Sequence, residues 1–332
     1  MRRTWKPTLL YAFAHFAVDF GCAYAMFAGY SGSAIGFLFY NFFAFAMQMP
    51  LGILADAMGK NRRFALLGAG LVCFMCCIPR FGLWGTMVLG LGNGLFHIGG
   101  GLDVLNLSGS RAAPLGVFVS PGALGIFLGP LWAQQGGSAI LVVHTLLFAC
   151  SGMLLWKQKD LPDNAPIAFP GPGLWPAATL LFLVVVLRSY GGLSGVMPWK
   201  SGLWSLAAVS AVVLGKTAGG FLADRLSLPK AAAGSLALAA LLFLFSQQPI
   251  PGVLALFLFN MTMPMTLFAL ARRMPGCKGF SFGLLTFALF LGFLPTYLGV
   301  GTLGGVGLSV ITVLSALLLL PVVVPRKSVI RS

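Results

Sequence analysis

The sequence predicts an all-α membrane protein of twelve transmembrane helices, arranged as two pseudo-symmetric six-helix bundles. Hydrophobic residues make up 58% of the 332-residue chain and charged residues only 8%, whereas soluble domains carry about 25% charged residues. The apolar residues form runs of about 20, the length at which a helix crosses a bilayer. The segment Gly52–Asp56 (GILAD) returns as Gly220–Asp224 (GFLAD), 168 positions later and close to half the chain length. Such an internal repeat is typical of secondary transporters.

The first half of the chain holds six apolar runs, separated by short polar or basic segments. The first run follows the basic N-terminal residues, the second ends at Asp56, and the third begins at the basic pair Arg62–Arg63. The fourth ends at Asp103, the fifth follows Arg111, and the sixth ends at Lys157. The predicted helices are 9–29, 33–55, 63–79, 82–104, 112–134 and 138–157.

The second half repeats this arrangement after one longer connection. Residues 158–173 hold Lys159 and Asp163 and then a Pro-rich stretch ending at Pro172, which predicts a cytoplasmic linker between two bundles. The predicted domains are therefore an N-terminal bundle of residues 1–157, the linker 158–173, and a C-terminal bundle of residues 174–332. The predicted helices of the second bundle are 174–197, 202–222, 231–247, 250–270, 279–297 and 301–324.

The distribution of positive charge predicts the orientation of these helices. Seventeen of the 21 Lys and Arg residues fall in alternate loops counted from the N-terminus, and the opposite loops hold only Arg80 and Lys200. Basic loops remain on the cytoplasmic side of a membrane. The N- and C-termini are therefore both predicted to be cytoplasmic, which requires an even number of spans. Arg188 and Lys216 fall inside predicted helices, and Lys216 is expected to extend toward the cytoplasmic face.

Weaker matches at an offset of 167 extend the repeat beyond the pentapeptide. They lie in the predicted fourth, fifth, tenth and eleventh helices. Together they favour two copies of a six-helix unit that have the same orientation. The matching positions are Asn93 with Asn260, Leu115-Gly116 with Phe282-Gly283, and Gly125 with Gly292.

The segment between the second and third helices carries a family resemblance. Gly52-x-x-x-Asp56-x-x-Gly59-x-x-Arg62-Arg63 closely resembles the signature loop of the major facilitator superfamily, and Gly220–Arg225 resembles its second-half copy. Gly125–Pro130 (GIFLGP) is similar to the Gly-Pro motif of antiporter members. The resemblance implies alternating access, with the first, fourth, seventh and tenth helices lining a central cavity.

Three shorter motifs resemble the fosmidomycin-resistance branch of this superfamily. They are His15–Asp19 in the first helix, Gly90–His97 in the fourth, and Arg188-Ser189 in the seventh. The sequence departs from that branch after His97, where Ile98 stands in place of the usual proline. On the four cavity-lining helices, the residues expected to contact substrate or to couple protons are His15, Asp19, Asn93, His97, Arg188, Tyr190 and Asn260.

The chemistry of these residues leaves alternatives open. His15 and Asp19 are four positions apart and share a helix face, and Asp19 lies about 15 Å into its helix at about 1.5 Å per residue. Asp19 is either a proton-coupling carboxylate or one member of a fixed ion pair with Arg188. Arg188 either forms that pair or binds an anionic group of the substrate. His97 either lines the cavity or packs as a hydrogen-bonded histidine, and no metal site is predicted.

The two repeated loops predict a gate on the cytoplasmic side. By resemblance, each aspartate would pair with nearby arginines and with a helix N-terminus of the other half, and so hold that side closed. The alternative is that the arginines only anchor the loops and the aspartates are solvated. Asp103 and Arg111 are expected at the surface. The predicted gate residues are Gly52, Asp56, Gly59, Arg62, Arg63, Gly220, Asp224 and Arg225.

The predicted function is secondary transport of a small organic solute, with proton-coupled efflux favoured. The alternatives are a proton-linked importer of a sugar or organic anion and, in a different class, a lipid translocase or a non-transporting scaffold. The sequence contains no motif for an enzyme, a cofactor or ATP, and its basic clusters alternate with apolar runs, unlike a nucleic-acid-binding surface. Its expected partners are a small-molecule substrate, protons and the lipid bilayer. We expect a monomer that is multi-pass in a bacterial cytoplasmic membrane.

Overall fold

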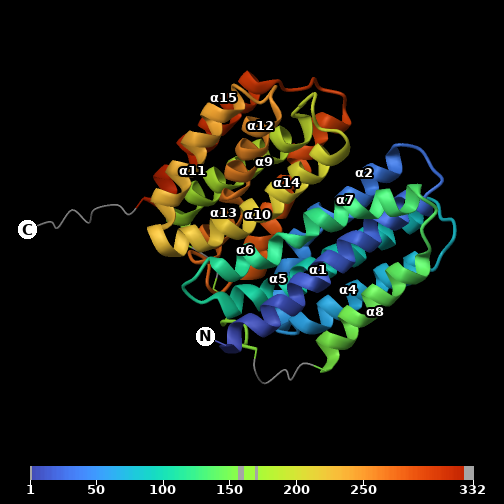
Figure 1. The fold of residues 1–332 in the computed structure, drawn as a ribbon. Helices are drawn as coiled ribbons and strands as arrows, with labels where there is room; N and C mark the ends of the chain where they lie inside the picture. Colours follow the sequence, from blue (N-terminus) through green and yellow to red (C-terminus); the bar gives the residue numbers. More distant parts are fainter. Residues whose placement is uncertain (1, 156–160, 169–170, 325–332) are drawn as a thin grey trace, which may run out of the picture.

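The computed structural model describes residues 2–155, 161–168 and 171–324, and these residues form helices joined by loops (Figure 1). The β-type pairing within these ranges consists of two isolated parallel bridges, Tyr30 with Phe81 and Gly195 with Leu303. Among the described residues, nine helices are long and apolar enough to cross a membrane, and two shorter apolar helices accompany them. The all-helical, multi-pass class predicted by the apolar runs is confirmed.

The helices of the first half follow the predicted runs, but two of the runs are interrupted. The second contains a π-helical turn, Phe42–Ala46, between α2 and α3, and the fifth is divided into α6 and α7. The predicted sixth helix extends to residue 157, beyond the described part of the chain. The helices are α1 (Arg2–Ala28), α2 (Ile35–Asn41), α3 (Gln48–Met58), α4 (Asn61–Cys76), α5 (Leu83–Ser108), α6 (Ala113–Val119), α7 (Pro121–Gln134) and α8 (Ala139–Leu155).

The second half has the same order of elements. Its predicted tenth helix is divided into α12 and α13, and residues 158–160 and 169–170 of the predicted linker lie outside the described ranges. The helices are α9 (Trp175–Ser194), α10 (Gly202–Leu226), α11 (Leu228–Phe243), α12 (Pro249–Asn260), α13 (Thr262–Ala271), α14 (Lys278–Tyr297) and α15 (Gly305–Val323). With 16 residues each, α4 and α11 are short for a span, so twelve spans and cytoplasmic termini stay predictions.

The break between α6 and α7 has a local chemical cause. Pro121 has no N–H to donate to the carbonyl of Val117, four residues earlier, and the Ser120 hydroxyl donates to that carbonyl instead, at 3.2 Å. The main chain therefore bends at Ser120. The two carbonyls between Val117 and Ser120, those of Phe118 and Val119, accept hydrogen bonds from side chains of other helices.

Helices α1–α8 and α9–α15 form two groups that lie side by side (Figure 1). The groups meet where α14 packs on α3 and where α10 packs on α6. Gly52 allows the first contact, since a Cβ there would overlap the backbone of Gly279, and Gly220 allows the second, since a Cβ would lie 2.7 Å from the carbonyl of Ala112. A third contact stacks the rings of Trp5 and Phe221, with centroids 5.7 Å apart.

Candidate functional site

The first group of helices buries a cluster of four polar residues on α1 and α5. Two are histidines, whose Nε2 atoms lie 2.8 Å apart: His15 and His97. Asp19 lies beside both, with Oδ2 3.2 Å from the Nε2 of His15 and Oδ1 3.8 Å from the Nε2 of His97. The amide of Asn93 donates to Asp19 Oδ1 at 2.9 Å. All four residues are buried, so the cluster is a polar site inside an apolar bundle.

Backbone groups fix both imidazole rings of this cluster. The Nδ1 of His15 lies 2.8 Å from the carbonyl of Phe118, beside the α6–α7 break, and the Nδ1 of His97 lies 2.9 Å from the carbonyl of Asn93. Gly122 of α7 forms a wall of the site, because a Cβ there would overlap Asp19 Oδ2 and His15 Nε2. Any larger residue at position 122 would displace the cluster.

The structure does not contain the alternative ion pair between Asp19 and Arg188. The salt bridges between described residues all involve Asp19 with a histidine. Arg188 on α9 is buried, its Nε has no hydrogen-bond partner, and its guanidinium carbon lies 5.9 Å from the ring centre of Phe259. Arg188 is therefore a buried cation without a carboxylate partner in the described ranges.

Lys216 on α10 is a second buried cation, and its expected extension toward the cytoplasmic face is wrong. Its side chain is 91% buried, and Nζ donates to the carbonyl of Val119, across the contact between the two groups, at 3.4 Å. At this point α10 packs closely on α6, because Gly116 of α6 has no side chain and a Cβ there would lie 2.8 Å from the carbonyl oxygen of Lys216. Lys216 acts electrostatically on Asp19, His97 and Arg188.

Two predicted cavity residues have no hydrogen bond to this cluster within the described ranges. The amide of Asn260 donates to the carbonyl of Leu256 in its own helix, at 2.9 Å. Tyr190 is partly buried on α9, two residues after Arg188. Asn260 and Asn93 hold equivalent positions in the repeat, but Asn93 donates to a carboxylate of another helix and Asn260 donates to a carbonyl of its own helix. The polar cluster belongs to the first group, and the two buried cations, which have no carboxylate partner among the described residues, belong to the second.

Each repeated aspartate accepts hydrogen bonds from a helix N-terminus of the other group. Asp56 Oδ1 and Oδ2 accept from the backbone N–H groups of Gly279 and Phe280, at 2.8 and 2.9 Å. Asp224 Oδ1 and Oδ2 accept from those of Ala112 and Ala113, at 2.7 and 3.1 Å. The two accepting aspartates are 168 positions apart in the sequence, and the donating residues Ala112 and Gly279 are 167 positions apart, so both match the offsets of the internal repeat. We call these two contacts the latch.

Two of the three arginines near the latch, Arg63 and Arg225, form no salt bridge within the described ranges. Arg62 donates to the carbonyl of Leu154. Gly59 ends α3 in the left-handed conformation, at φ 61°, and its N–H bonds to the carbonyl of Ala55. This glycine cap directs the chain away from Asp56, so the carboxylate remains available to α14.

The sequence did not reveal a second polar network, which joins the linker to the latch end. Asp103 was expected at the surface but is buried, because Tyr11 donates to its Oδ2 and the amide of Asn61 donates to its Oδ1 at 2.9 Å. Asn164 of the linker accepts from Asn61 and Asn106, at 2.7 and 2.8 Å. The ends of α1, α4 and α5 are therefore joined to the linker through amide side chains.

The same network reaches the second group. Lys278, at the start of α14, donates to Asn106 Oδ1 at 2.9 Å, and the thiol of Cys277 lies 3.4 Å from the carbonyl of Ala168 in the linker. Gly276 lies against the backbone of Pro166 and Ala168. The described linker residues, 161–168, therefore contact both groups beside the latch. Burial raises the pKa of the Cys277 thiol, so this thiol stays protonated at neutral pH.

Replacing Asn164 with alanine is expected to release the linker. The change removes the acceptor of Asn61 and Asn106 and the donor to the carbonyl of Ala55, which lies 3.1 Å away. Each lost hydrogen bond costs about 1 kcal/mol. Hydrogen exchange of residues 161–168 should therefore become at least tenfold faster, whereas Asp163→Asn, at an exposed neighbouring position, should change it little. Unchanged exchange in Asn164→Ala would show that this side chain does not hold the linker.

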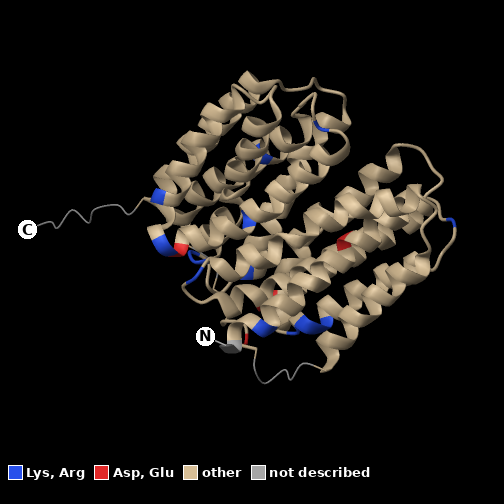
Figure 2. Ribbon diagram, viewed as in Figure 1, with Lys and Arg blue, Asp and Glu red and all other residues tan. Residues whose placement is uncertain are grey.

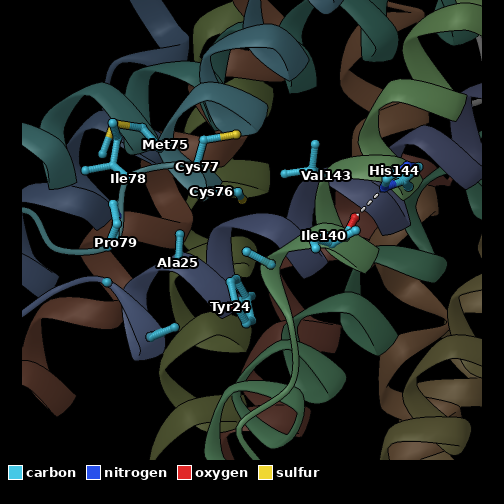
Figure 3. A pocket seen from close by; sticks show the side chains of 13 residues that line it. Tyr24, Ala25, Met75, Cys76, Cys77, Ile78, Pro79, Ile140, Val143 and His144 are labelled. Atoms are coloured by element: carbon cyan, nitrogen blue, oxygen red, sulfur yellow. Dashed lines mark hydrogen bonds between the residues drawn. The ribbon is translucent and has the colours of Figure 1, made fainter.

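Two hollows lie away from the cluster. One, of about 520 Å³, lies between the ends of α1, α4 and α8 and is lined mainly by apolar side chains, with His144 at its edge (Figure 3). The other, of about 1150 Å³, contains Arg111, Arg272 and Arg273 beside the latch residue Asp224.

Burial and then the charge of Arg272 lower the pKa of Arg273. Lys and Arg gather at the end of the molecule where the N-terminus lies (Figure 2).

No family model and no curated protein sequence matches the chain. Solved structures do match it. A variant of the E. coli fucose:proton symporter FucP aligns with a TM-score of 0.65 and 14% identity, over 94% of this chain and 97% of that one. FucP in the outward conformation, described as a major facilitator superfamily transporter, aligns with a TM-score of 0.63 and 13% identity, over 97% and 99%.

The chain has the fold of a major facilitator superfamily transporter. Because both alignments cover nearly the whole chain, the likeness includes both groups of helices. The fold that the resemblance of the Gly52–Arg63 loop implies is thus the fold observed. At 13–14% identity the likeness extends no further than the fold, and the fosmidomycin-resistance branch stays a prediction.

Proposed function

We propose that this chain is a proton-coupled secondary transporter that moves a small organic anion across a membrane by alternating access. The observation that carries the proposal is the division of charge between the two groups of helices. Asp19 and two histidines occupy the first group, and Arg188 and Lys216 are buried in the second without a carboxylate partner in the described ranges. Burying an unpaired cation is costly, and a bound anion would repay that cost.

The arrangement couples the anion to the proton by electrostatics. Lys216 acts on both Asp19 and His97, so its charge opposes a proton on the cluster. An anion bound by Arg188 and Lys216 cancels part of that charge and makes it easier for the cluster to hold a proton. The two ligands therefore bind cooperatively, and such coupling is reciprocal. Cooperative binding of anion and proton on one side of the membrane gives symport.

The latch supplies the gate. Asp56 and Asp224 hold the two groups together at one end through charge-assisted hydrogen bonds to helix N-termini. We assign this end to the cytoplasm, because the basic loops gather there. The protein then works as a monomer in a bacterial cytoplasmic membrane, with cytoplasmic termini and twelve spans, and it opens to the outside while the latch is closed.

Proton-coupled efflux is the second candidate, and the Gly125–Pro130 motif is its support. Gly125 and Gly129 of this motif have a packing role. A Cβ at Gly125 would lie 2.6 Å from the carbonyl of Phe16, and one at Gly129 would lie 2.7 Å from the N atom of Tyr24. The glycines thus bring α7 against α1 and support the wall at Gly122. This packing role serves import and export equally, so the motif does not decide between them. The two buried cations without a carboxylate partner in the described ranges then favour the anion symporter.

Proton flux in liposomes tests the proposal. The purified protein is reconstituted with an internal pH dye and given succinate, lactate, methylphosphonate, glucose or ethidium on one side. We expect inward proton flux with at least one anion and none with glucose or ethidium. Asp19→Asn should abolish it, whereas His144→Gln, at an exposed position, should retain it. Outward proton movement driven by ethidium would favour efflux, and no flux with any compound would count against proton-coupled transport.

A further inference from the structure

The proton of the buried cluster can be located from the hydrogen-bond acceptors around it. A carbonyl oxygen only accepts hydrogen bonds. Because the Nδ1 of His15 contacts the carbonyl of Phe118 and the Nδ1 of His97 contacts that of Asn93, both Nδ1 atoms carry hydrogen. In a neutral imidazole the other nitrogen, Nε2, then carries no hydrogen and presents a lone pair. The two Nε2 atoms, 2.8 Å apart, would therefore direct lone pairs at each other unless a cation lies between them.

We propose that His15 and His97 together bind the transported proton, shared between their Nε2 atoms, and that Asp19 remains a carboxylate that balances its charge. The proposal rests on the proton-coupled function above and moves the coupling site from the carboxylate to the histidine pair. Placing the proton on Asp19 would satisfy the 3.2 Å contact to His15 but would leave the two lone pairs opposed. A proton between the rings resolves that contact.

The distance between the two Nε2 atoms distinguishes a bound proton from a bound metal ion. The His15, Asp19 and His97 ligand atoms all lie within 4.8 Å of one another, which would permit a metal. Two nitrogens bound at about 2.0–2.1 Å to a tetrahedral zinc lie about 3.3 Å apart. The 2.8 Å between the two Nε2 atoms instead falls within the range of hydrogen bonds that an N–H group donates, about 2.7–3.2 Å.

The surrounding charges fit a cluster that holds one proton. The titratable groups that face it are Asp19 and Cys22 of α1, Tyr40 of α2 and Lys216 of α10. A protonated histidine pair carries +1 and Asp19 carries −1, so the loaded cluster is neutral, as its burial requires. Loss of the proton to water leaves a net charge of −1, which then attracts Lys216. The proton therefore controls how strongly the cluster holds the second group of helices.

Nitrogen-15 NMR of the full-length protein labelled at histidine tests this assignment without any substrate. The chain has three histidines, and the exposed His144 serves as the internal reference. We expect signals of nitrogen that carries hydrogen for the Nδ1 atoms of both buried rings. The Nε2 signals should lie between those of nitrogen that carries hydrogen and those of nitrogen without hydrogen, which we call the bare type. In His97→Gln, the Nε2 of His15 should revert to the bare type. His144→Gln should leave the buried signals unchanged.

Two further variants retain both histidines. Asp19→Asn removes the balancing charge, and Gly122→Ala places a Cβ against Asp19 and His15. Both should return the Nε2 signals to the bare type, and elution as a single peak in size-exclusion chromatography would show that each is folded. Bare Nε2 signals in the parent protein, or one bound zinc per chain, would overturn the proposal. A shared proton without flux in liposomes would contradict the proposed transport instead.

Discussion

Replacing Asp56 and Asp224 together with asparagine is expected to shift the protein about 100-fold toward a conformation that is open at the latch. Each carboxylate accepts two backbone N–H groups at a helix N-terminus, and hydrogen bonds to a charged group contribute about 1.5–3 kcal/mol each. Asparagine retains one acceptor and loses the charge. We expect a loss of about 2 kcal/mol at the half-buried Asp56 and about 1 kcal/mol at the exposed Asp224, where solvent weakens the contact.

Spin labels on opposite sides of the latch would measure this shift. Met58 and Lys230 are exposed at the ends of the two groups, and labels there require a background from which the six cysteines have been removed. The distance between the labels should increase in the double variant, and Asp56→Asn alone should give the larger part of the change. Asp163→Asn removes an acid at the same end and should leave the distance unchanged. An unaltered distance in the double variant would show that other contacts close this end.

The sequence indicated the two aspartates of the latch as candidate gate residues, because the information is local. Gly52–Asp56 and Gly220–Asp224 each place a small residue and an acid one turn apart on one helix face. The repeat then requires equivalent partners in the opposite half. The partners themselves, the backbone groups of Gly279 and Ala112, leave no side-chain signal. Only the family resemblance suggested a helix N-terminus as the partner, and the sequence alone could not separate that contact from a solvated aspartate.

The partners of the buried charges could not be predicted, since they depend on how helices rotate against each other. Spacing placed His15 beside Asp19, but whether Arg188 or His97 completes the cluster depends on the packing of α5 and α9 on α1. Lys216 has the position of a residue that extends to the surface, but it is buried and its Nζ donates to the carbonyl of Val119 in the other group. Asp103 is likewise buried because Tyr11 and Asn61, on two other helices, supply its hydrogen bonds.

Replacing Arg188 with methionine is expected to abolish most transport without destabilising the protein, and this result would distinguish a substrate-binding residue from a structural one. Arg188→Met should reduce anion-driven proton flux at least about 30-fold, because truncating one partner of a buried charge pair costs about 2–5 kcal/mol. The same change should leave the melting temperature of the ligand-free protein unchanged or raise it. Methionine fills a similar volume beside Phe259 and removes a buried charge that has no carboxylate partner in the described ranges.

The opposite result is expected if Arg188 stabilises the fold. Breaking a buried ion pair costs about 3–5 kcal/mol, so the melting temperature of Arg188→Met would then fall by several degrees. Arg80→Met, at an exposed loop position, is the matched control and should change neither flux nor melting temperature. A protein that melts normally, or later, but no longer moves protons with an anion identifies Arg188 as a cation kept buried for its substrate. That combination would also explain why Arg188 and Lys216 are buried in the second group without a carboxylate partner in the described ranges.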